Sequence, residues 1–250
     1  MPNLGLHIGF ALDCAERLGH PLLKEYQGAF LLGSTTPDIR LSLGWDRERT
    51  HFFKLDSDVQ GTGVPRLLDE NPNLRSSERL NRETTAFLLG YMSHLETDET
   101  WIVQVWRRFF GEGSTLGQDP LANVYDRLFQ FEMDRVERQN VQDLEGAVAS
   151  IRDAYAGVDI GFIDGPALQK WQHTVVARLD RDLPWERFRT LVSRVHRAVE
   201  EDAVDGIMER LPTLLERVHT EINQEELAAF REQAIQAFVS RATTYLDGKS

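Results

Sequence analysis

Five residues in the N-terminal part of the chain are of types that bind divalent metal ions: His7, Asp38, His51, His94 and Asp98. His94 and Asp98 lie four residues apart in a stretch with helical periodicity. This spacing places both side chains on one face of a helix, about 5–6 Å apart at Cβ. Nitrogen and carboxylate ligands together suit Zn²⁺, with iron and manganese as substitutes. The set therefore predicts a divalent metal site.

Each of these residues also has a purely structural interpretation. Asp38 can cap the sharp turn in TTPD, as aspartate often does. His94 and Asp98 can form a solvated pair on a helix surface, because Glu96 and Glu99 beside them indicate an exposed face. The order of the five residues and the sequences around them favour the metal site over these alternatives.

The elements that must position these residues are predicted to be helices. Apolar residues recur three and four positions apart in the first segment and again over residues 77–110. Clusters of glycine and proline predict loops over residues 32–66 and 111–120. No stretch alternates in the manner of a β-strand, so we expect an all-α fold. Further helices are predicted at about 119–139, 142–156, 165–180, 184–201 and 222–246.

The sequences around the candidate ligands resemble a known family. The segments MPNLGLH, FLLGSTTPDIR, RTHFF and FLLGYMSHLETDETW, in this order, resemble the zinc-dependent phospholipase C family, which is related to the S1/P1-type nucleases. The resemblance covers residues 1–110. It implies a multi-helix domain of the phospholipase C/P1 nuclease type, a trinuclear zinc cluster and the hydrolysis of phosphate esters.

The resemblance also implies a role for each candidate residue. Asp38, His51, His94 and Asp98 would surround one zinc ion. His7 would help to hold a second ion, with Asp98 as the bridging carboxylate. Asp38 would also orient or deprotonate the attacking water, which makes it the predicted catalytic residue. One or two zinc ions are therefore expected, and no other cofactor is predicted.

The chain departs from the family at the ligands of a third zinc ion. Secreted members use the amino group of the mature N-terminus, after a signal peptide is removed, whereas we expect no signal peptide here. The family also places further histidines soon after the HxxxD pair, but TWIVQVWRRFFGEGSTLG contains none. His173, or His196 with Glu200, would have to supply them from further along the chain. A third ion therefore lacks evident ligands.

Composition and charge narrow the remaining possibilities. The chain of 250 residues holds 40 acidic and 28 basic side chains, and its net charge of −12 disfavours general nucleic-acid binding. Cys14 is the single cysteine, so no intramolecular disulfide can form. No segment approaches the roughly 18 apolar residues that a membrane span requires. The N-terminus lacks the basic region of a secretory signal, so we expect a cytoplasmic protein.

These observations predict a single helical domain over residues 1–250, with the metal-binding motifs in 1–110 and helices of unassigned role in 111–250. The predicted function is the hydrolysis of a small-molecule or lipid phosphate ester by a zinc-activated water. Two alternatives stay open. One is a non-catalytic helical module that keeps a reduced metal cluster and binds a partner. The other is a metal-dependent enzyme outside phosphate chemistry, since a fold does not fix a reaction. The sequence predicts nothing about the oligomeric state.

Overall fold

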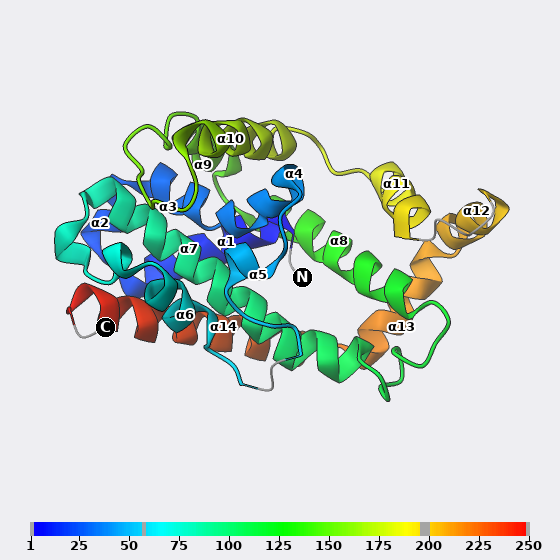
Figure 1. Cartoon of the computed structure of the whole chain (residues 1–250). Coiled ribbons are helices and arrows are strands. Elements are labelled where there is room, and N and C mark those ends of the chain that lie inside the picture. The colour runs from blue at the N-terminus through cyan, green and yellow to red at the C-terminus, as the bar shows by residue number, and fades with distance from the viewer. Residues whose placement is uncertain (1–2, 57–58, 196–200, 249–250) are drawn as a thin grey trace.

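A computed structural model describes residues 3–56, 59–195 and 201–248, and all the regular elements among them are helices (Figure 1). The all-α prediction is confirmed. The elements before residue 111 are α1 (Leu4–Leu18), α2 (Pro21–Glu25), α3 (Gln27–Gly33), η1 (Thr36–Ile39), α4 (Arg40–Leu43), α5 (Glu48–His51), α6 (Gly63–Glu70), η2 (Pro72–Leu74), η3 (Ser77–Arg79), α7 (Arg82–Trp101) and the π-helix η4 (Ile102–Phe110). The later elements are α8 (Ala122–Asn140), α9 (Leu144–Ile151), α10 (Gly165–Leu179), α11 (Glu186–Val195), α12 (Glu201–Glu209), α13 (Leu211–Glu221) and α14 (Gln224–Leu246).

The central helix of the fold is α7. Nearly all of its residues are buried, and α1, α3, α6 and α14 pack around it. Figure 1 shows α7 running through the middle of the molecule, with α10 above it and α14 below it in this view. A helix that is covered on all sides has no wet face. The polar side chains of α7, including His94 and Asp98, therefore lie inside the protein.

Two glycines allow α3 and α7 to approach each other closely. A Cβ atom at Gly90 would lie 1.9 Å from the carbonyl oxygen of Phe30, and one at Gly33 would lie 2.0 Å from the carbonyl oxygen of Phe87. No side chain fits at these distances, so the crossing requires glycine on both helices. The contact places the C-terminal end of α3 against the part of α7 that carries the candidate ligands.

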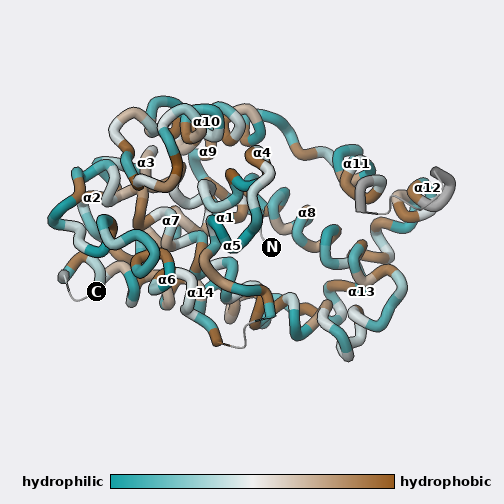
Figure 2. The backbone as a smooth tube through the Cα atoms, in the orientation of Figure 1, coloured by the Kyte–Doolittle hydropathy of each residue, from teal (hydrophilic) through white to brown (hydrophobic). Residues whose placement is uncertain are grey.

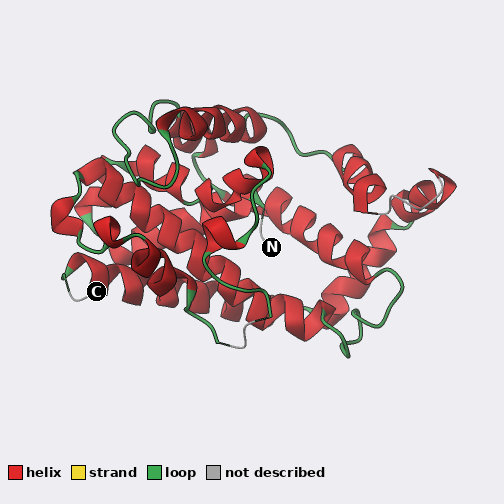
Figure 3. Ribbon diagram, in the orientation of Figure 1, coloured by secondary structure: helices red, strands yellow, loops and turns green. Residues whose placement is uncertain are grey.

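The predicted long helices agree with the structure better than the predicted loops do. Together, α7 and η4 form one helical stretch inside the region 77–110, and residues 111–120 form turns. The prediction of one loop over 32–66 is wrong, because the chain forms η1, α4 and α5 there and begins α6 (Figure 3). An element of four residues holds about one turn and leaves no repeat to detect. The helix predicted over 142–156 ends at Ile151.

Buried apolar side chains from the N-terminal and C-terminal halves of the chain form one contiguous cluster. Figure 2 shows hydrophobic and hydrophilic residues interspersed along the helices, as expected when each helix covers this core with one face. In the described part of the chain, no helix combines the length and the apolar character needed to cross a membrane.

Candidate metal centre

The five candidate residues come together where α1, η1, α5 and α7 meet. His7 lies in the first turn of α1, Asp38 lies in η1, His51 ends α5, and His94 and Asp98 lie one turn apart on α7. We call these residues the five-residue cluster. The three histidines and Asp98 are at most 2% exposed. The side chain of Asp38 is 14% exposed and is the most accessible member.

Asp98 lies at the centre of the five-residue cluster. Its Oδ1 atom is 3.6 Å from Nε2 of His7. Its Oδ2 atom is 3.3 Å from Nε2 of His51 and 3.6 Å from Nε2 of His94. Asp38 joins through its Oδ1 atom, which is 3.8 Å from Nε2 of His51. The atoms that face one another are ring nitrogens and carboxylate oxygens, which are the atoms that bind divalent metals.

Hydrogen bonds on the outer side of two rings fix which nitrogen carries the proton. Nδ1 of His94 lies 2.8 Å from the carbonyl oxygen of Ser34, which can only accept, so Nδ1 donates and Nε2 keeps a lone pair. The Thr50 hydroxyl donates to the carbonyl of Arg47 and accepts from Nδ1 of His51 at 3.1 Å. Both Nε2 atoms point inward, and Nε2 of His94 is an acceptor; Nε2 of His51 is one as well in the tautomer that donates from Nδ1 to Thr50. Metal-binding histidines have this arrangement, with the outer N–H held by a second group.

The centre of the cluster contains more acceptors than donors. Nε2 of His7 and Oδ1 of Asp98 are buried and make no hydrogen bond within the described part of the chain. The His7 ring stacks on the His94 ring with centroids 3.8 Å apart and planes 12° apart. Buried polar atoms without partners are rare in folded proteins, and a bound cation would satisfy all of these lone pairs together. The residues present therefore fit a divalent metal ion.

Two overlapping groups offer ligand atoms that lie within 4.8 Å of one another: His7, His94 and Asp98, and Asp38, His51 and His94. His94 belongs to both groups. Its Nδ1 atom is bonded to Ser34, which leaves Nε2 as its one available ligand atom. A single nitrogen lone pair binds one ion, so His94 can complete only one of the two groups at a time.

Burial dominates the electrostatics of the cluster. It holds the pKa of His7 well below its usual value and lowers the pKa of His51 to about 3, so both imidazoles are neutral at physiological pH. Burial also raises the pKa of Asp38. For Asp98, burial raises the pKa, but its neighbours, among them the Arg47 guanidinium, outweigh this effect and hold the pKa well below its usual value. Neutral imidazoles beside a carboxylate are ready to bind a metal without first losing protons.

Local backbone geometry at Phe52 shapes the site. Phe52 follows His51 and ends α5 in the left-handed region, with φ of 57° and ψ of 15°. A non-glycine residue in this conformation costs on the order of 1 kcal/mol. Contacts around the turn offset that cost, because the Phe52 ring packs edge-on against Phe162 and the Tyr91 hydroxyl donates to the carbonyl of Thr50. The turn leaves His51 in the cluster, while Phe53, two residues later, lines a neighbouring cleft.

Arg47 also belongs to the site, although the sequence analysis did not identify it. Its NH2 atom donates to Oδ2 of Asp98 at 2.8 Å, and its side chain is 11% exposed. The guanidinium carbon lies 4.2 Å from the centre of the Phe53 ring, within the range of a cation–π contact. A signal was present in the sequence, because Arg47 precedes His51 by four residues and one helical turn brings such positions together.

The expectation that Glu96 and Glu99 mark an exposed face is wrong. Each residue is only 3% exposed. Glu96 pairs with Arg241 of α14, and Glu99 accepts hydrogen bonds from backbone N–H groups at the start of α6. Partners from other parts of the chain thus keep both carboxylates inside the protein. His94 and Asp98 are therefore not a solvated surface pair.

The remaining histidines lie apart from the cluster or outside the described residues. His173 is exposed on α10 and joins neither ligand group. His196 and Glu200 lie outside the residues that the structure describes. His20 and His219 are exposed, the first at the start of α2 and the second near the end of α13. Among the described histidines, none beyond His7, His51 and His94 joins a group that could hold a metal ion.

A cleft of about 770 Å³ adjoins the cluster and is lined by α5, the segment after it and α6. Arg47 and Phe53 lie in its wall, and Arg47 is also bonded to Asp98. Further charged residues of both signs line the cleft: Asp46, Glu48, Arg49, Lys54, Asp56, Arg66 and Glu70. The cleft is therefore an open polar space that meets the buried cluster at Arg47.

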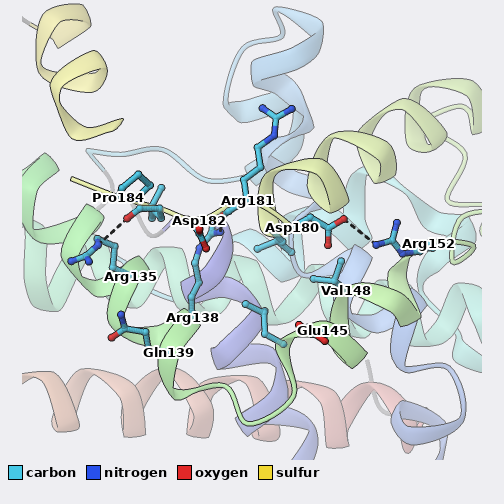
Figure 4. Close-up of a pocket in the computed structure, with 13 residues that line it drawn as sticks. Arg135, Arg138, Gln139, Glu145, Val148, Arg152, Asp180, Arg181, Asp182 and Pro184 are labelled. Carbon is cyan, nitrogen blue, oxygen red and sulfur yellow. Dashed lines mark hydrogen bonds and ion pairs between the residues drawn. The ribbon is translucent and has the colours of Figure 1, made fainter. Parts of the chain in front are cut away.

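A second cleft, of about 720 Å³, lies between α8, α9 and the end of α10 (Figure 4). Its arginines have structural partners. Arg135 and Arg138 donate to backbone carbonyls in residues 178–183, and Arg152 pairs with Asp180. These bonds satisfy carbonyl groups at and after the C-terminus of α10. No member of the five-residue cluster lines this cleft, so it plays no part in the candidate centre.

Comparisons with known proteins agree with the resemblance seen in the motifs. No curated protein and no solved structure matched the chain. Residues 6–101 match the family model described as zinc dependent phospholipase C. The matched segment contains all five residues of the cluster, and it lies within the region 1–110 over which the motifs resemble that family. The chain is thus similar to zinc-dependent phospholipase C over residues 6–101.

Proposed function

We propose that this protein is a metal-dependent hydrolase of phosphate esters, with zinc as its ion and the five-residue cluster as its ligands. The observation that carries the proposal is the inward convergence of acceptor atoms on His51, His94 and Asp98 in a buried position. The match to zinc dependent phospholipase C over residues 6–101 supports phosphate chemistry. We assign one ion to the group of Asp38, His51 and His94, with Asp98 beside it, and a second ion to His7 and Asp98.

The protein's own groups position and activate the reactants in this proposal. A zinc ion supplies Lewis acidity when bound, because it polarises a phosphoryl group and lowers the pKa of water. Ser34 and Thr50 hold the His94 and His51 rings with their lone pairs directed inward. Asp38 is the most accessible carboxylate of the cluster, and burial raises its pKa. A carboxylate with a raised pKa is a stronger base, so Asp38 takes the proton of the attacking water.

The substrate in this proposal is a small-molecule or lipid phosphate ester that enters through the cleft beside α5. That cleft reaches the cluster at Arg47, and it is large enough for a phosphate group with part of its substituents. The reaction breaks one phosphorus–oxygen ester bond and adds water across it.

Metal analysis combined with turnover tests the proposal. The purified protein is expected to contain at least one zinc per chain, and His94→Ala should lose it. With bis(4-nitrophenyl) phosphate and 4-nitrophenyl phosphate as substrates, Asp38→Asn should keep zinc and lower kcat about 100-fold or more. His219→Ala is the matched control, because His219 is an exposed histidine paired with Glu132. It should keep both zinc and activity.

Two results would speak against the proposal in different ways. A wild-type protein without zinc whose stability is unchanged by a chelator would exclude the metal centre. Zinc binding without turnover of either ester, in protein that is fully folded, would instead identify a metal-binding module without hydrolase activity. The two outcomes separate the loss of the site from the loss of the reaction.

A further inference from the structure

Arg47 connects the buried cluster to the cleft. Its guanidinium donates to Oδ2 of Asp98, the same oxygen that lies 3.3 Å from Nε2 of His51. The same side chain lies in the wall of the 770 Å³ cleft. Among the charged residues described in that wall, Arg47 is the one that contacts the five-residue cluster. The three histidines of the cluster do not line this cleft, so a group that enters it meets Arg47 first.

Two contacts hold the guanidinium in place at this boundary. The Phe53 ring lies under it at 4.2 Å, and the Phe53 carbonyl accepts from NH1 at 3.5 Å. A stacked guanidinium keeps its plane and presents its N–H groups in a fixed fork, which suits the tetrahedral oxygens of phosphate better than a lysine ammonium does. Arg47 is therefore pre-organised and does not have to be ordered when a ligand binds.

The charge of the site also calls for an anion beside Arg47. A divalent ion balances the two carboxylates Asp38 and Asp98, and the guanidinium of Arg47, with that of Arg40 near both Asp38 and Arg47, then leaves positive charge in excess. With only 11% of the Arg47 side chain exposed, water screens its charge poorly. An anion that arrives from the cleft would neutralise it, and a phosphate group carries both the charge and the acceptor oxygens to do so.

We propose that Arg47 is the phosphoryl-binding residue of the site and holds the non-bridging oxygens of the phosphate ester next to Asp98. This inference rests on the proposed function, because it names the residue that receives the substrate of that reaction. Arginine clamps of this kind stabilise the charge that develops on phosphoryl oxygens as the ester bond breaks. Arg47 thus binds the substrate directly and leaves the activation of water to Asp38.

Isothermal titration calorimetry with inorganic phosphate, in the presence and absence of zinc, tests the assignment without relying on turnover. Arg47→Gln should keep the zinc content of the wild type and bind phosphate about 10- to 100-fold more weakly, as expected for the loss of a charged hydrogen bond. Arg47→Lys keeps the charge but loses the fork, so it should bind phosphate with intermediate affinity. Circular dichroism checks that both variants are folded. If Arg47→Gln does not fold, Arg47→Lys alone still provides the test.

Arg49→Gln is the matched control. Arg49 lines the same cleft, but its guanidinium stacks on Trp45 at 3.6 Å and has no contact with the cluster. This variant removes the same charge and should change phosphate affinity less than about threefold, because exposed charges contribute little. If Arg47→Gln and Arg49→Gln weaken phosphate binding equally, Arg47 contributes only to the general charge of the cleft, and the assignment is overturned.

Two other outcomes also decide the question. Loss of zinc in folded Arg47→Lys would show that Arg47 acts by holding Asp98 for the ion, which overturns direct phosphate binding. If the wild type binds no zinc, the proposed function fails, but the phosphate titration without metal still tests whether Arg47 binds phosphate. Phosphate binding that disappears with Arg47→Gln would then retain the anion site, whereas a wild type that binds no phosphate in either condition would overturn it.

Discussion

Nε2 of His51 and Nε2 of His94 lie 3.3 Å apart, and both become acceptors when Nδ1 of His94 donates to Ser34 and Nδ1 of His51 donates to Thr50. Two lone pairs at this distance repel each other, and Oδ2 of Asp98 adds a third acceptor beside them. Burial prevents water from relieving the repulsion. The arrangement is unfavourable as a core packing contact and favourable as a cation site, which is why it carries the functional proposal.

The tautomers of these two histidines can be measured directly. In chelator-treated protein at pH 7.5, long-range ¹⁵N–¹H spectra should show His51 and His94 as neutral rings protonated at Nδ1. Zinc should then shift the Nε2 resonances and leave the Nδ1 protons in place, because Thr50 and Ser34 still accept from them. A ring protonated at Nε2 in either histidine would contradict the proposed ligand geometry.

The Thr50 hydroxyl should therefore matter for metal affinity. Thr50→Val removes the acceptor for Nδ1 of His51 and should weaken zinc binding about 10- to 100-fold, the usual effect of losing an outer partner of a ligand. Thr97→Val is the control, because the Thr97 hydroxyl is buried on α7 and, among the described residues, bonds the carbonyl of Ser93 and no member of the cluster. Competition with a fluorescent zinc chelator measures both affinities, and equal values for the two variants would remove Thr50 from the site.

The lowered pKa of His51 predicts how stability depends on pH in the metal-free protein. The pKa is about 3 in the folded chain, against 6.5 for an unperturbed histidine. The unfolded chain takes up a proton below pH 6.5 and the folded chain does not, so stability is lost as the pH falls from 6.5 toward 3. Between pH 6.5 and 5 the loss from this one residue should be about 1 to 2 kcal/mol.

Urea denaturation of chelator-treated wild type and His51→Gln isolates that contribution. The wild type should lose more stability than the variant over the same pH interval, because glutamine does not titrate. Parallel stability curves for the two proteins would show that the ring of His51 is accessible to protons, against its observed burial.

Much of the candidate site could be predicted from the sequence because its residues lie in recognisable local patterns. His94 and Asp98 share one helix face at a spacing that sequence displays directly. Burial was predicted wrongly for Glu96 and Glu99, since the partners that bury them, Arg241 and the start of α6, are far away in the sequence. Arg47 was missed although it precedes His51 by about one helical turn, because its role depends on a contact with Asp98, which lies 51 residues away in the sequence.

The fold was predictable where helices are long and amphipathic and unpredictable where they are short. The helix predicted over 165–180 closely matches α10, whose apolar positions repeat over several turns. In contrast, α4 and α5 each span four residues, and the long-range contacts that fix them are invisible in a periodicity pattern. The elements that carry His51 were thus the hardest to foresee, although the residue itself was identified.

The crossing of α3 and α7 should not tolerate a side chain at Gly90. Gly90→Ala would place its Cβ 1.9 Å from the Phe30 carbonyl, a backbone atom that cannot move alone, and should destabilise the protein by about 3 kcal/mol or more. Gly206→Ala is the control, because Gly206 lies in α12 with open space at its Cβ. That change should stabilise by up to about 1 kcal/mol through helix propensity. Thermal unfolding compares the two variants, and a soluble Gly90→Ala protein of wild-type stability would show that the two helices are further apart.

Glu99 fixes the cleft wall to the central helix, and its removal should loosen that wall. Its carboxylate accepts from the backbone N–H groups of three successive residues, Gly61, Thr62 and Gly63, at the start of α6. In Glu99→Gln, one acceptor oxygen becomes an NH₂ group that faces these donors, so the protein should lose about 1 to 3 kcal/mol of stability. Amide exchange at Gly61 and Gly63 should also accelerate. Glu70→Gln removes the same charge from an exposed pair with Arg66 and should cost less than about 0.5 kcal/mol. If both variants unfold at the same urea concentration, the backbone contacts of Glu99 contribute no more than a surface ion pair, and α6 must be held by its apolar face alone.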